Sequence, residues 1–79
     1  MWVERNMVWR EVENAIELHS KMKIGRYFYH TLGVRFGLKE DALKKKNMID
    51  QLGYISIIKQ VEPVAPRFEK YEIWVRRKK

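Results

Sequence analysis

The sequence predicts one small α+β domain in which helices come first and a β-hairpin follows near the C-terminus. Residues 7–24 and 38–52 carry apolar side chains at three- and four-residue spacing, the spacing of one helix face. Two later runs, "YISIIKQVE" and "KYEIWVRRK", are rich in β-branched and aromatic residues. With 79 residues, the chain can build one hydrophobic core but not two, so residues 1–79 are expected to form a single domain.

The first helix is predicted over residues 7–24. Its inward face would consist of Val8, Val12, Ala15, Ile16, His19 and Met22. Asn6 is placed to cap the helix, and Gly25 is placed to end it. Residues 1–6 are expected to be extended or to take part in a dimer.

A short second helix is predicted over "RYFYHTLG", residues 26–33, although its aromatic residues also favour a strand. The following "VRFG" is bounded by Gly33 and Gly37 and is expected to be the turn between two helices. The third helix is then predicted from residue 38 to residue 52, with acids in its first turn and Gly53 after its end. The two β-rich runs flank "PVAPRFE", which predicts a hairpin with a long tip.

Composition limits the classes of function. The formal net charge is +7, which favours a polyanionic partner. Cysteine is absent, which excludes disulfides, thiolate zinc sites and cysteine nucleophiles, and the two histidines have no supporting ligand pattern for zinc. No glycine-rich phosphate loop, nucleophile motif or paired-carboxylate spacing is present, so neither an enzyme nor a cofactor is expected. No apolar run would span a bilayer, and no signal peptide is visible, so a soluble cytoplasmic protein without a membrane partner is expected.

The run "DALKKKNMIDQLGYISI" contains three consecutive lysines within the third predicted helix. Successive residues of a helix are about 100° apart, so Lys44 and Lys45 are expected to point outward while Ala42 and Ile49 point inward. With Asn47 and Gln51 they would form a basic, polar face suited to phosphates and base edges. The alternative is an ordinary solvated face that needs no ligand.

The stretch "GLKEDALKKKNMIDQLGYISI" followed by "YEIWV" resembles the winged helix-turn-helix family. The resemblance implies a three-helix domain with a C-terminal β-hairpin wing. It also implies that helix 39–52 enters the major groove of duplex DNA while the wing follows the backbone. The DNA contacts that it implies are Lys39, Lys44, Lys45, Asn47 and Gln51 on the helix, with Arg67 and Lys70 in the wing.

The hairpin is the most basic part of the chain, and Arg67 lies at its expected tip between Pro66 and Phe68. Ion pairs across the hairpin would account for part of this basicity. The basic tail, residues 76–79, is expected to be an electrostatic arm or a solubilising end. Trp74 falls on the strand face opposite Ile73 and Val75, where it would be exposed or cover an interface.

The N-terminal "MWVERNMVW" carries more apolar bulk than a short helix buries. It would form a homodimer surface or fold back on the protein's own core. The leading prediction is a duplex DNA-binding protein, a small transcriptional regulator. A protein-interaction or assembly module on the same fold is the alternative, and single-strand or RNA binding through exposed tyrosines is the third class.

Overall fold

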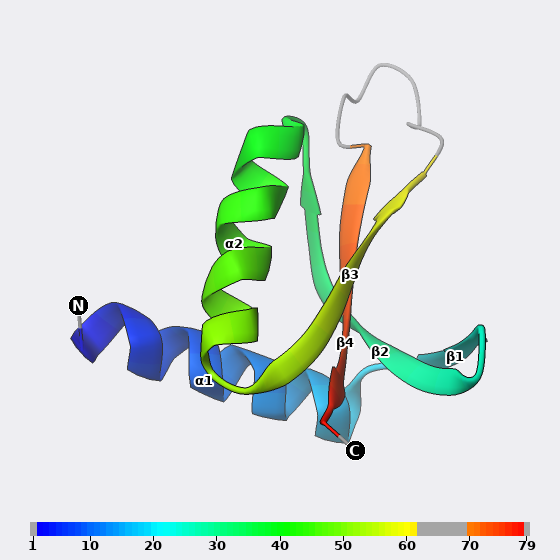
Figure 1. Cartoon of the computed structure of the whole chain (residues 1–79), viewed down its shortest axis with the longest axis horizontal. Helices are drawn as coiled ribbons and strands as arrows, with labels where there is room; N and C mark the ends of the chain where they lie inside the picture. The colour runs from blue at the N-terminus through cyan, green and yellow to red at the C-terminus, as the bar shows by residue number, and fades with distance from the viewer. Residues whose placement is uncertain (1, 62–69, 79) are drawn as a thin grey trace.

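The computed structural model describes residues 2–61 and 70–78, with backbone elements in the order α-β-β-α-β-β (Figure 1). The elements are α1 (Trp2–Leu18), β1 (Lys21–Ile24), β2 (Tyr27–Phe36), α2 (Lys39–Gln51), β3 (Tyr54–Gln60) and β4 (Tyr71–Arg77). The strands form one antiparallel sheet in the order β1-β2-β4-β3. In this order β2 and β3, the strands on either side of α2 in the sequence, are separated by β4.

The predicted three-helix winged helix-turn-helix with a C-terminal hairpin wing is wrong. The described residues contain two helices, and the strands predicted as a wing are half of a four-stranded sheet. The segment predicted to hold the second helix and the helix-helix turn forms β2, and the end of the predicted first helix forms β1. No helix-turn-helix unit is present in the described part of the chain, because α2 is preceded by a strand.

The first helix begins and ends earlier than predicted. The backbone is helical from Trp2, so residues 2–6 are not extended, and α1 ends at Leu18. Lys21–Ile24 forms β1, which pairs with Tyr27 to His30 of β2. Gly25 does not end a helix: it has a φ of 65° in the two-residue turn between paired Ile24 and Tyr27, where hairpin geometry requires a positive φ.

The ten-residue β2 replaces the predicted short helix over residues 26–33 and the turn after it. Its aromatic residues favour a strand, and β1 and β4 provide pairing on both sides. Gly33 has a φ of 91° and lies where the β2–β4 register shifts between Thr31 and Arg35, a β-bulge. The glycine that suggested a helix end therefore bends a strand.

The helix predicted over residues 38–52 is confirmed as α2. Glu40 and Asp41 lie in its first turn, where acids complement the helix dipole, and Gly53 follows its end with a φ of 96°. The strands expected after Gly53 are β3 and β4, and they pair with each other from Tyr54–Arg77 to Gln60–Tyr71. The first two residues of the predicted basic tail, residues 76–79, belong to β4.

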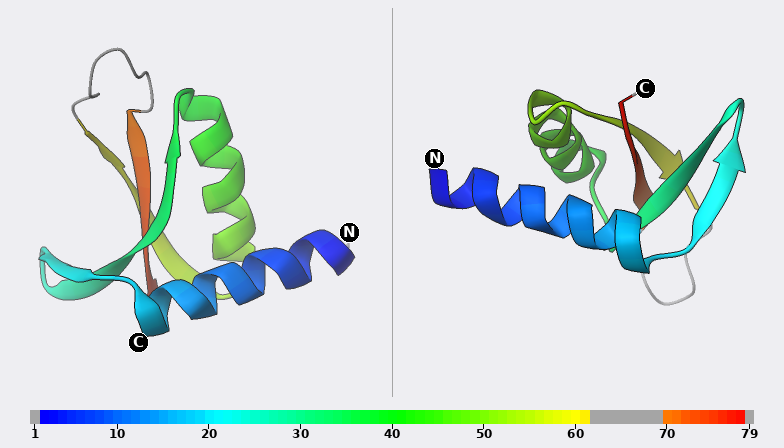
Figure 2. Two further views of the ribbon diagram at one scale, coloured as in Figure 1. Left: turned by 180° about the vertical axis from the view of Figure 1, so that it is seen from behind. Right: turned by 90° about the horizontal axis from the view of Figure 1, so that it is seen from below.

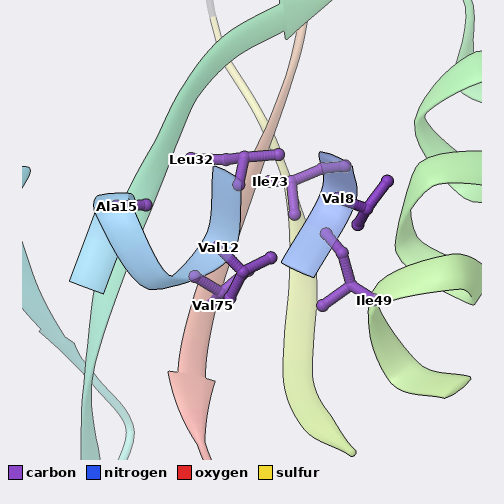
Figure 3. Packing of buried hydrophobic residues seen from close by; sticks show 7 residues of the cluster. All are labelled: Val8, Val12, Ala15, Leu32, Ile49, Ile73 and Val75. Carbon is purple, nitrogen blue, oxygen red and sulfur yellow. The ribbon is translucent and has the colours of Figure 1, made fainter. Parts of the chain in front are cut away.

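Both helices pack on one face of the sheet (Figure 3). The buried cluster consists of Val8, Val12 and Ala15 from α1, Ile49 from α2, and Leu32, Ile73 and Val75 from the sheet. Tyr71, Ile73 and Val75 were predicted to pack on the helices, and of these Ile73 and Val75 are fully buried while Tyr71 is partly exposed. Burying branched aliphatic side chains of this kind contributes about 1.5–3 kcal/mol each.

Trp74 lies on the opposite face of the sheet, as its alternation with Ile73 and Val75 predicts. It is 9% exposed, so of the two alternatives predicted for Trp74 the exposed one is wrong, and the interface stays a prediction. Its indole Nε1 donates to Glu72 Oε1 (3.1 Å), and the Lys59 ammonium lies 5.9 Å from its ring centroid. Both of these contacts come from the sheet, Glu72 from β4 itself and Lys59 from the neighbouring β3.

The β1–β2 hairpin projects from the sheet on the side away from α2 (Figure 2). The C-terminal end of β4 contacts the second half of α1 through Arg77 and Glu13. Within the described ranges, no helix is both long enough and apolar enough to cross a membrane.

Candidate nucleic-acid interface

Three of the predicted DNA-contacting residues share one exposed stripe of α2. Lys44, Asn47 and Gln51 are exposed and follow one another at three- and four-residue spacing. Lys39 is also exposed, in the first turn of the helix. The structure therefore brings Lys44, Asn47 and Gln51 together as the helical periodicity predicts.

Lys45 does not point outward with Lys44, and this prediction is wrong. Its Nζ lies 3.0 Å from Glu11 Oε1 of α1, and both side chains are about a quarter to a third exposed. The next lysine, Lys46, pairs with Asp50 one turn later (2.8 Å). Lys45 and Lys46 are thus both paired with carboxylates of the protein itself.

The outer surface of α2 is close to electrically neutral. Glu40 and Asp41 are exposed beside Lys39, and they offset the charges of Lys39 and Lys44. Because long-range attraction of a polyanion depends on net positive charge, α2 is a weaker phosphate surface than its sequence suggests.

Of the predicted wing residues, Arg67 lies outside the described residues. Lys70 is exposed just before β4, and its backbone N–H donates to the Phe36 carbonyl oxygen (2.9 Å). Phe36 is followed after two residues by Lys39, the first residue of α2. The main chain of Lys70 is therefore anchored at the end of the sheet where α2 begins.

A more basic surface lies on the β1–β2 hairpin, which sequence reasoning did not select. No acidic residue occurs between Glu17 and Glu40, and Lys21, Lys23 and Arg26 lie in that interval. All three cations are exposed. The sequence does contain a signal for this surface: an interval without acidic residues that includes three consecutive aromatic residues, Tyr27, Phe28 and Tyr29.

The same hairpin exposes two aromatic rings. Tyr27 is 47% exposed and Phe28 is 53% exposed, and as neighbours in a strand they point to opposite faces of β2. Each ring has a cation against it: the Lys21 ammonium lies 5.0 Å from the Phe28 centroid, and the Arg76 guanidinium carbon lies 3.8 Å from the Tyr27 centroid. We call these residues the hairpin surface, defined as Lys21, Lys23, Arg26, Tyr27, Phe28 and Arg76.

A small pocket of about 260 Å³ opens between β2 and the end of β4. The residues that line it are Ile16, Tyr27, Phe28, His30, Arg76 and Arg77. Five of these six come from the two strands, and Ile16 comes from α1. The pocket thus joins the hairpin surface to the C-terminal end of the sheet.

Beside this pocket, α1 is tied to the sheet by a cluster of three polar side chains. Arg77 Nη2 donates to Glu13 Oε1 (2.8 Å), and the Tyr54 hydroxyl donates to Glu13 Oε2. The Tyr54 hydrogen bond, and then that of Arg77, hold the pKa of Glu13 below its ordinary value of 4.5. Partial burial, and then the bond to Glu13, raise the pKa of Tyr54 to about 12. The hydrogen bond to Glu13 likewise raises the pKa of Arg77.

A second hollow, of about 520 Å³, lies along α1, where the N-terminal segment was expected to dimerise. It is lined by Asn6, Met7, Arg10, Glu11 and Asn14. Met7 is 67% exposed, and nearby Trp9 is 49% exposed, so these two residues do not fold back into the core. The homodimer stays a prediction, in which Met7 and Trp9 would supply the apolar contacts.

No group of three histidine or acidic side chains that could hold a metal ion is found in residues 2–61 and 70–78. Comparisons with protein-family models, with curated proteins and with solved structures returned no match to this chain. The interpretation of the site therefore depends on its geometry and chemistry alone.

Proposed function

We propose that the protein binds single-stranded nucleic acid through the hairpin surface. The observation that carries this proposal is that two half-exposed aromatic rings, Tyr27 and Phe28, each have a cation against them. Both rings lie in the interval between Glu17 and Glu40, which has no acidic residue. Unpaired bases stack on aromatic side chains, and the neighbouring phosphates require positive charge. The net charge of +7 supports a polyanionic ligand.

In this mechanism, bases of the strand stack on Tyr27 and Phe28 while the flexible ammonium groups of Lys21 and Lys23 follow the backbone. Each stacked base is worth about 1–3 kcal/mol in proteins of this kind. Stacking tolerates any base, because every base has a π-face, so weak sequence preference is expected. Counterion release makes the affinity fall with salt, by roughly 0.7 logarithmic units per contacted phosphate for each tenfold increase.

Fluorescence anisotropy of a labelled single-stranded oligonucleotide, repeated from low to near-physiological salt, tests the proposal. Tyr27→Ala and Phe28→Ala should each weaken binding about fivefold to a hundredfold, the loss of one stacked base. Leu43→Ala is the matched control, because Leu43 is an exposed apolar residue of α2, 40% exposed, away from the hairpin. The proposal is wrong if wild type does not bind at low salt, or if both aromatic variants bind as tightly as wild type.

A second candidate function is duplex DNA binding by α2, as predicted from the sequence. The shared exposed stripe of Lys44, Asn47 and Gln51 favours it, because amide and ammonium groups at this spacing can reach base edges and phosphates. Competition between unlabelled duplex and single-stranded oligonucleotide of equal length separates the two candidates. If α2 makes the contact with nucleic acid, the duplex competes better than the single strand. In that case Lys44→Ala and Gln51→Ala weaken binding, while Tyr27→Ala does not.

A further inference from the structure

The pocket between β2 and β4 exists because the two strands separate. Their ladder ends at the pair His30–Val75, although β2 begins three residues earlier and β4 continues for two residues more. The side chains that flank the separation are Tyr27, Phe28 and His30 on one strand and Arg76 and Arg77 on the other. A gap between strands, lined by polar groups, is a place where a small ligand can meet fixed donors.

Arg76 is held in this gap by aromatic rings. Its guanidinium carbon lies 3.8 Å from the Tyr27 centroid and 5.5 Å from the Tyr29 centroid. Nη1 donates to the Arg77 carbonyl oxygen (3.1 Å), while Nε is buried without a hydrogen-bond partner. Among the described residues, no carboxylate lies within ion-pair distance of this guanidinium. Arg76 is thus a stacked, oriented cation whose charge is not neutralised by a carboxylate of the described residues.

The other charged group of the pocket differs in this respect. Arg77 is paired with Glu13, and Glu17 of α1 adds a second negative charge near it. His30 donates from Nδ1 to the carbonyl oxygen of His19 (3.0 Å), which fixes the ring and leaves Nε2 as its free nitrogen. The unsatisfied donor capacity of the pocket therefore belongs to Arg76.

We infer that this pocket is a phosphate subsite, with the Arg76 guanidinium as its principal donor. A planar guanidinium donates two parallel hydrogen bonds to phosphate oxygens, and stacking on Tyr27 and Tyr29 orders it before the ligand arrives. The volume of about 260 Å³ is below the range of roughly 300–1,000 Å³ typical of pockets for drug-sized ligands, which suits one phosphate group. The inference rests on the proposed function for the source of the phosphate, a strand terminus or an internal linkage.

Inorganic phosphate tests the subsite without any nucleic acid. In a titration followed by nuclear magnetic resonance, the Nε–H resonance of Arg76 in the wild-type protein should shift saturably with phosphate. Chloride at the same ionic strength should leave it unchanged. A resonance that does not move, or that moves equally with chloride, overturns the subsite whether or not the protein binds oligonucleotides.

Oligonucleotides with and without a 5′-phosphate identify the source. Arg76→Gln should weaken binding about tenfold or more, as expected for the loss of a charge-assisted hydrogen-bond pair, whereas the neighbouring exposed Lys78→Gln should cost less than about threefold. Loss confined to the 5′-phosphorylated strand indicates a terminal phosphate, and equal loss for both strands indicates an internal one.

Equal affinities for Arg76→Gln and Lys78→Gln with both strands overturn the subsite. If wild type binds neither strand, the proposed function fails, and the phosphate titration still decides the subsite.

Discussion

Lys45 of α2 and Glu11 of α1 form an ion pair with 3.0 Å between Nζ and Oε1, and this pair links the two helices beside the buried core. The partly exposed side chains place it between a surface pair and a buried one. Such a contact stabilises the fold without being available to a ligand. The lysine run of α2 therefore contains residues with different roles, although they are adjacent in the sequence.

Lys45→Ala is expected to lower the free energy of unfolding by up to about 1 kcal/mol, because a partly exposed ion pair contributes roughly 0.2–1 kcal/mol. Lys44→Ala, which removes an exposed lysine from the same helix, should leave stability unchanged. Urea denaturation of both variants measures the difference. In a double-mutant cycle with Glu11→Gln, the effect of Lys45→Ala should disappear, and an unchanged effect would show that the pair contributes nothing.

Acid should remove a stabilising contribution from Glu13. Since its pKa is lowered in the folded protein, the contribution is present above the ordinary value of 4.5 and is lost as the pH falls through the depressed value. Glu13→Gln should therefore differ most from wild type near neutral pH and should approach it in acid. Urea midpoints over this range measure the effect, with Glu17→Gln, an exposed residue one turn later, as control. A difference independent of pH would contradict the assignment.

Alkali should act through Tyr54. Its pKa is raised from 10.0 to about 12, so its contribution is present below pH 10 and is lost as the pH rises toward 12. The ultraviolet absorbance of the phenolate should show one of the four tyrosines titrating last, and Tyr54→Phe should remove that component. If the last component survives in Tyr54→Phe, the raised pKa belongs to another tyrosine.

Asp50 connects the end of α2 to β3. The Ser56 hydroxyl, in a residue 5% exposed, donates to Asp50 Oδ1 (2.7 Å). Asp50→Ala leaves this buried hydroxyl without its acceptor and should cost about 1–3 kcal/mol. Lys46→Ala, which removes only the pair with Asp50 Oδ2, should cost roughly 0.3–0.5 kcal/mol. The denaturation midpoint of Asp50→Ala should rise when Ser56→Ala is added, and a further fall would show that the hydroxyl is not the cause.

Gly33 and Gly25 provide a matched pair for the bulge in β2. Both have positive φ, which costs a residue with a side chain about 1–2 kcal/mol. A Cβ at Gly33 would also lie 2.6 Å from His19 Cε1 and displace a ring whose Nδ1 donates to the Thr31 carbonyl oxygen (2.8 Å), whereas a Cβ at Gly25 meets nothing within 4 Å. Gly33→Ala should therefore lower the unfolding midpoint more than Gly25→Ala. Equal losses would show that His19 moves at no cost.

The second half of the chain was predictable because its signals are local. Acids in the first turn of α2, apolar residues at helical spacing and a glycine after the end all lie within residues 38–53, and they agree with one another. The strands that follow are also adjacent in sequence and pair with each other. Short-range patterns therefore predicted these elements and the stripe of Lys44, Asn47 and Gln51.

The segment from Lys21 to Phe36 was misread because its signals are ambiguous at short range. Gly25 and Gly33 fit helix ends as well as a hairpin turn and a bulge, since all of these use a positive φ. The strand β2 pairs with β4, which lies about forty residues later in the chain, and no local pattern reports that pairing. The hairpin surface went unnoticed for a similar reason, because it forms only where β1 pairs with β2 and where β4 brings Arg76 against Tyr27.

The sequence by itself determined an α+β composition, a strongly basic chain, the position of α2 and the residues on its exposed stripe. Each of these follows from composition or from periodicity within a few turns. Only the tertiary structure decided that Lys45 faces Glu11, that β2 is a strand, and that Arg76 stacks on Tyr27 and Tyr29. Those relationships join residues far apart in the chain, and they exist because burying one common core fixes which distant elements become neighbours.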